Sequence, residues 1–138
     1  MNEIDNQRLM QGMKAIEKLE LPLGHQHGLL HGMRLQAPAF KQHFMEELGA
    51  FFAEGQGIDD KTRTLLALVL ACGSATPPAM LEFCTAAALK HGWQRDQLVN
   101  ALELTALFNG WPAAIAATQT VIATFTKLDE EDARHANR

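Results

Sequence analysis

Residues 59–73 read DDKTRTLLALVLACG, and this stretch decides the fold class. Asp59 or Asp60 can accept hydrogen bonds from the free backbone N–H groups at the start of a helix, and Gly73 can end that helix. The run TLLALVLA between them is apolar on nearly every side. Because a short helix of this kind belongs where other elements surround it, the stretch predicts a helix at the centre of a bundle.

Three further helices are predicted on the carboxyl side of this stretch. Thr76 offers a capping hydroxyl and Pro77 a proline in the first turn, which predicts a helix that ends at Gly92. The next two helices are predicted over residues 95–109 and 112–128. The last segment, residues 129–138, has no apolar face, so we expect a frayed tail there.

Two helices are predicted on the amino side. Residues 5–19 carry apolar side chains at steps of three and four, at Leu9, Met13, Ile16 and Leu19. Pro38 favours the first turn of a second helix, whose apolar seam is predicted at Phe40, Phe44, Leu48 and Phe51. Residues 21–36 between them hold three glycines and three histidines without a clean period, which predicts a loop or one short turn.

The composition favours one all-α domain over residues 1–138, with its helical core at about residues 38–128. A chain of 138 residues is long enough to bury one core, and its 47% of hydrophobic and 20% of charged residues are typical of globular proteins. No window alternates apolar and polar residues over the length of a strand, so six helices are expected and no sheet.

The charge pattern argues against several classes of partner. The net charge is −4 and the basic residues are scattered, so we expect no binding to nucleic acid or to an anionic membrane. The longest apolar stretch, residues 65–72, is far shorter than the ~20 residues that cross a bilayer, and the first residues lack the pattern of a signal peptide. We therefore expect a cytoplasmic protein whose two cysteines, Cys72 and Cys84, are free thiols.

Four short motifs together resemble the carboxymuconolactone decarboxylase and alkyl hydroperoxidase D-like family. They are DKTR at 60–63, AL at 88–89 with Gly92, DQL at 96–98, and GWPAA at 110–114. No one of them is specific, and the resemblance is carried by their order and spacing. It implies a six-helix bundle that assembles as a ring-shaped homo-oligomer, a homotrimer or hexamer, with active sites near the subunit contacts.

The resemblance implies one of two chemistries, and the sequence departs from both. The hydroperoxidase branch uses a Cys-x-x-Cys pair with a histidine four residues later, and those positions are Pro77, Met80 and Cys84 here. The decarboxylase branch keeps the same histidine as an acid or base on an acidic lactone, and Cys84 again replaces it. We expect a protein that acts on or binds a small acidic or lactone-type metabolite at Cys84. The alternatives are a thiol-dependent peroxidase and a catalytically silent oligomer that binds a ligand.

Cys84 is the predicted catalytic residue, because a thiolate can transfer a proton or attack an electrophile. The other interpretation is a small buried hydrophobe, since leucine, methionine and alanine share its helix face and no base lies within one turn. Cys72 closes an apolar run, and it can form a redox pair with Cys84 only if their Cα atoms come within bridging distance.

Four other residues are candidates for substrate binding, namely Arg63, His27, His31 and Trp111. Arg63 suits a substrate carboxylate or a structural acid such as Glu103. The histidines of residues 25–31 either lie in a solvated loop or cover a pocket, where one of them serves as acid or base. Their spacing lacks a nearby acid or cysteine, so neither a metal site nor a cofactor is predicted. Trp111 packs at its turn or forms the wall of a pocket.

Overall fold

The computed structural model describes residues 3–21, 30, 36–53, 57–73 and 76–137. Within these ranges the chain forms six α-helices and no strand, which confirms the all-α prediction. The helices are α1 (Glu3–Leu19), α3 (Pro38–Phe51), α4 (Asp60–Cys72), α5 (Pro78–Lys90), α6 (Arg95–Asn109) and α7 (Trp111–Ala136). None of these described helices is both long enough and apolar enough to cross a membrane. Most of the predicted loop over residues 21–36 lies outside the described residues.

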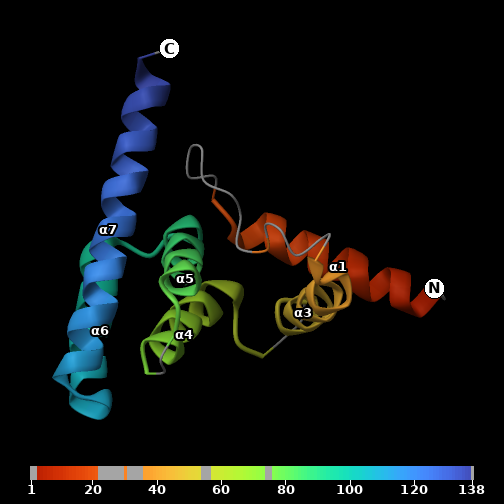
Figure 1. Cartoon of the computed structure of the whole chain (residues 1–138), viewed down its shortest axis with the longest axis horizontal. Coiled ribbons are helices and arrows are strands. Elements are labelled where there is room, and N and C mark those ends of the chain that lie inside the picture. Colours follow the sequence, from red (N-terminus) through yellow and green to blue (C-terminus); the bar gives the residue numbers. More distant parts are fainter. Residues whose placement is uncertain (1–2, 22–29, 31–35, 54–56, 74–75, 138) are drawn as a thin grey trace.

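The helices pack in pairs that follow their order in the chain, as Figure 1 shows. α1 crosses α3, α4 lies against α5, and α6 lies beside α7. α5 joins the pairs, because it also contacts α1 and α7. Its run of alanines allows this close approach on several sides, and Thr85, Ala86, Ala87 and Ala88 are all buried.

The central helix is therefore α5, and the prediction of a wholly surrounded helix at residues 59–73 is wrong in part. Leu68 and Cys72 of α4 are buried, but Leu66 is exposed and Leu70 keeps 75% of its surface open. The predicted start of this helix is confirmed, since the Thr62 backbone N–H donates to the Asp59 carboxylate at 2.7 Å. α5 begins one residue later than predicted, at Pro78.

α1 and α3 cross through glycines, which corrects the apolar stripes predicted for them. A Cβ atom on Gly12 would collide with the Met45 carbonyl group, so only glycine allows the two backbones to approach this closely. With small residues at the crossing, three large side chains of the predicted stripes face outward instead: Met13, Phe40 and Phe51.

α7 continues to Ala136, so the prediction of a helix end near Leu128 and a frayed tail is wrong. The helix has no apolar face beyond Leu128, and ion pairs stabilise it there. The Arg95 guanidinium donates to both oxygens of Asp129 at 3.0 and 2.6 Å. Further along, Glu131 pairs with Arg134 at 2.9 Å and lies 3.0 Å from His135. Pairs at three- and four-residue steps stabilise a helix even where it has no core contact.

Two clusters of buried side chains hold these helices together. The larger joins α4, α5, α6 and α7 around Leu68, Leu98, Leu102 and Val121, and it includes both cysteines. The smaller joins α1 and the end of α3 to α5 through Ala15, Leu19, Phe52 and Ala87. Phe83 of α5 packs against both clusters, so the two meet along this helix.

Candidate functional site

An apolar cavity of about 360 Å³ lies where the two clusters meet. Four helices form its walls: α1 contributes Leu19, α3 contributes Phe44 and Leu48, α4 contributes Leu70, and α5 contributes Met80 and Phe83. The volume falls in the range of ~300–1,000 Å³ that small-molecule sites occupy. Because the walls come from helices far apart in the sequence, the cavity exists only in the folded chain.

Cys84 lines this cavity from the middle of α5. Only 7% of its surface is exposed, and its other neighbours belong to the larger core cluster. Burial, with a smaller contribution from the neighbouring Cys72, raises the pKa of the Cys84 thiol to about 11. Since a thiol with this pKa stays protonated near neutral pH, the cavity holds an S–H group and not a thiolate.

Cys72 belongs to the same core cluster and lines a second cavity of about 430 Å³ between α4, α5 and α7. The two cavities share Ala71 and Thr76 in their walls. Burial raises the pKa of Cys72 to about 11 as well. Both cysteines are free, as predicted.

The described lining of the Cys84 cavity contains no charged side chain. Its polar groups besides the thiol are the hydroxyls of Thr64 and Thr76. The Thr64 hydroxyl donates to the Lys61 carbonyl at 2.6 Å, so its proton is already used within α4. A ligand in this cavity therefore meets mostly hydrocarbon, with the Cys84 S–H group as a weak donor.

The structure places neither Arg63 nor Trp111 in the described lining of this cavity. The Arg63 Nε donates to the Ile58 carbonyl at 2.8 Å, which is a structural role at the start of α4. Trp111 begins α7 with 69% of its surface exposed. Glu103 is exposed on α6. His27 and His31 lie outside the described residues.

His91, the next histidine after Cys84 in the sequence, makes a structural contact and is not among the described lining residues of the cavity. The His91 Nε2 atom lies 3.2 Å from the Lys18 carbonyl oxygen, and Lys90 donates to the Glu20 carbonyl at 3.1 Å. These contacts join the last turn of α5 to the end of α1. His91 thus helps to hold one wall of the cavity in place.

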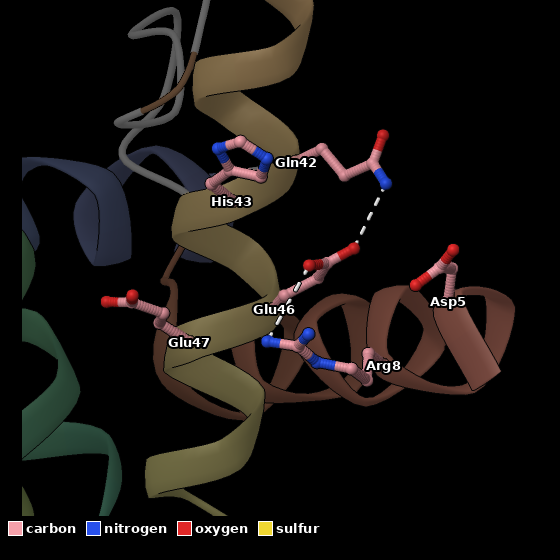
Figure 2. A pocket seen from close by; sticks show the side chains of 6 residues that line it. All are labelled: Asp5, Arg8, Gln42, His43, Glu46 and Glu47. Atoms are coloured by element: carbon pink, nitrogen blue, oxygen red, sulfur yellow. Dashed lines mark hydrogen bonds and ion pairs between the residues drawn. The ribbon is translucent and has the colours of Figure 1, made fainter. Parts of the chain in front are cut away.

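A third cavity, which is polar and has a volume of about 340 Å³, lies at the crossing of α1 and α3 (Figure 2). Its buried group is Glu46, which accepts a hydrogen bond from Gln42 at 3.0 Å and pairs with Arg8 at 3.8 Å. Figure 2 shows these two partners reaching Glu46, while the Glu47 carboxylate points away from it. The remaining lining residues are Asp5 and His43. Within the described residues, no group of histidines, cysteines and acids is arranged to hold a metal ion.

Sequence reasoning missed Glu46 and most of the cavity walls. The four-residue spacing of Gln42 and Glu46 indicates a pair on one helix face, but not that α1 buries it. Leu19 and Phe83 carried no signal beyond apolar character. Their shared role depends on contacts between α1 and α5, which lie about 70 residues apart in the chain.

Comparison with known proteins agrees with this helical arrangement. The model of the carboxymuconolactone decarboxylase family matches residues 38–123, which span α3, α4, α5, α6 and the first half of α7. None of the curated proteins compared with the chain matches it. Cys84 and most of the walls of its cavity fall inside the matched region, whereas Leu19 precedes it.

Proposed function

Because this chain belongs to the carboxymuconolactone decarboxylase family, we propose that it takes a small lactone-type metabolite into the cavity beside Cys84. The observation that carries the proposal is the position of Cys84, which lines the apolar cavity. The resemblance of the sequence to the family supports the proposal, since it implies that the family's histidine stands at this position. The cavity has the size of a small-molecule site and is formed by four helices.

Cys84 acts in this proposal as a protonated group that contacts the ligand. With a pKa of about 11, roughly one thiol in ten thousand is ionised near neutral pH. Peroxide reduction requires the thiolate as nucleophile, so the raised pKa favours ligand binding over a peroxidase reaction. The S–H group donates a weak hydrogen bond to an oxygen of the ligand.

Self-association is part of the same proposal. Large apolar side chains at the end of α6 and the start of α7 face solvent in the single chain: Leu104, Leu107, Phe108, Trp111 and Ile115. Leu107 and Phe108 keep 76% and 77% of their surface exposed. Several large apolar side chains exposed on consecutive helices are typical of a protein–protein contact, and we expect a homotrimer or hexamer that covers them.

Ligand entry can be tested by NMR of the methionine methyl groups. Met80 lines the cavity, whereas Met10 is exposed on α1 outside it, so the two provide a reporter and a control in one sample. The Met80 signal is assigned from the Met80→Leu variant. We expect small lactones to shift the Met80 signal saturably and to leave Met10 unchanged. Equal shifts at both methyls, or none at Met80 with any lactone, would refute the proposal.

A further inference from the structure

The lining of the Cys84 cavity restricts the charge of its ligand. We propose that the site selects an uncharged, mainly hydrocarbon molecule with one acceptor oxygen directed at Cys84, and rejects the corresponding carboxylate. This inference rests on the proposed function, since it names the class of ligand that the same cavity takes.

The described lining of the cavity offers no positive charge that could pair with a carboxylate. No described lining residue carries a charge, and Arg63, which could have paired with a carboxylate, donates to the Ile58 carbonyl outside the lining. An ionised carboxylate that enters such a cavity loses its water and meets no cation among the described lining residues. An ester or lactone loses far less, because its carbonyl is neutral.

The hydrogen-bond donors in the lining also favour a neutral ligand. The Thr64 hydroxyl is bonded within α4, to the Lys61 carbonyl. The Cys84 S–H group lies in the wall formed by α5, to which Phe83 and Ala87 also contribute. A weak neutral donor of this kind suits a carbonyl oxygen and does little to stabilise an anion.

The volume sets the size of the ligand. At the ~30 Å³ that one molecule occupies in liquid water, 360 Å³ holds roughly a dozen non-hydrogen atoms. A single ring with a short substituent or a small bicyclic compound fills this space. Phe44, Phe52 and Phe83 in the walls provide faces and edges for an aromatic ring.

A matched pair of probes tests the charge preference directly. γ-Phenyl-γ-butyrolactone and its ring-opened form, 4-hydroxy-4-phenylbutanoate, share one carbon skeleton and differ in charge. We expect calorimetry on the full chain to show binding of the lactone and at least ~100-fold weaker binding of the carboxylate. Equal or tighter binding of the carboxylate overturns the inference and leaves the proposed function intact. If neither probe binds and no lactone shifts the Met80 methyl signal, the proposed function itself fails.

Two variants connect the preference to the cavity. Met80→Lys places an ammonium group at a half-buried lining position of similar length, and Met80→Leu is its uncharged control. We expect the lysine variant to bind the carboxylate at least ~10-fold better than the wild type, and the leucine variant to keep the preference for the lactone. An unchanged preference in the lysine variant, with its helical circular dichroism and Tm retained, overturns the inference.

A variant with a larger side chain in the cavity tests whether the cavity binds a small ligand or part of another protein chain. Ala67→Leu adds bulk to the α4 wall, and we expect it to abolish lactone binding while the oligomeric mass stays constant. A changed oligomeric mass, together with no lactone binding by the wild type, means that a second copy of the chain fills the cavity. That result overturns the inference.

Discussion

The Lys18 Nζ atom lies 2.7 Å from the Asp60 carboxylate and 3.3 Å from the Phe52 carbonyl oxygen. One side chain of α1 thereby ties the end of α3 to the start of α4. Leu19 and Phe52, beside these contacts, both line the Cys84 cavity. The Lys18–Asp60 pair therefore helps to hold the α1–α3 half of the molecule against α4 and α5.

Loss of this pair is expected to weaken the cavity wall. We expect Lys18→Met to lower the free energy of unfolding by about 1 kcal/mol at low salt, since the pair is only partly buried. The loss becomes smaller at high salt because ions screen the pair. Urea unfolding measures both values, and Lys14→Met, on the exposed face of α1, is the matched control. Equal effects of the two variants would contradict the role given to Lys18.

The glycine crossing of α1 and α3 predicts a position that tolerates no side chain. Gly12→Ala places a methyl group against the Met45 carbonyl, and we expect a loss of about 2–3 kcal/mol in the free energy of unfolding. Gly57→Ala is the control, because a Cβ atom there meets no atom within 4 Å. Chemical denaturation of both variants tests the prediction. A Gly12→Ala protein as stable as Gly57→Ala would show that the helices do not cross at this residue.

The raised pKa values of the two thiols predict how the rate of their alkylation depends on pH. Burial raises the pKa of both cysteines to about 11, so we expect native protein to react slowly with iodoacetamide near neutral pH and faster as the pH approaches 11. Peptide mass spectrometry separates the rates of Cys72 and Cys84. In unfolded protein both rates should follow an ordinary thiol. Rapid alkylation of native Cys84 near pH 7 would indicate a thiolate and revive the peroxidase alternative.

The same pKa shifts predict how stability depends on pH. Unfolding returns the pKa of each thiol from about 11 to its ordinary value of 9.0, so above pH 9 the unfolded state loses protons first. Stability is then present below pH 9 and falls as the pH rises toward 11. We expect urea unfolding to show a loss of about 1 kcal/mol per thiol between pH 8 and 10. In the Cys84→Ala variant, the loss in the free energy of unfolding between pH 8 and 10 should be about half as large. If the variant loses as much as the wild type, groups other than Cys84 cause the pH dependence.

The exposed patch on α6 and α7 predicts the effect of a surface charge. We expect Phe108→Asp to lower the oligomeric mass measured by light scattering after size exclusion, because the contact would bury an unpaired carboxylate. Met10→Asp, also at an exposed apolar position but on α1, should leave the mass unchanged. If the wild type is monomeric at high concentration, or both variants keep its mass, this patch is not the contact.

Local signals in the sequence determined the helices and several of their ends. The bounds of α6 were predicted as they occur, and the cap of α4 was predicted at Asp59 or Asp60 and lies at Asp59. Both succeed because a cap and a helical period depend on residues within one or two turns. Family membership was likewise carried by the order of short motifs, and the family model confirms it over residues 38–123.

Which faces of those helices meet depends on contacts between segments that are far apart in the sequence. The outward position of Phe51 and the burial of Glu46 depend on the opposite helix. The extension of α7 past Leu128 depends on the contact between Asp129 and Arg95 of α6 as well as on local ion pairs. The cavity at Cys84 is the clearest case, since Leu19, Phe52, Leu70 and Phe83 converge there from separate segments. Helical periodicity specifies an apolar face but not the face that it packs against. Sequence patterns were therefore enough to predict a bundle of helices. The position of a ligand cavity within that bundle depends on how distant segments pack.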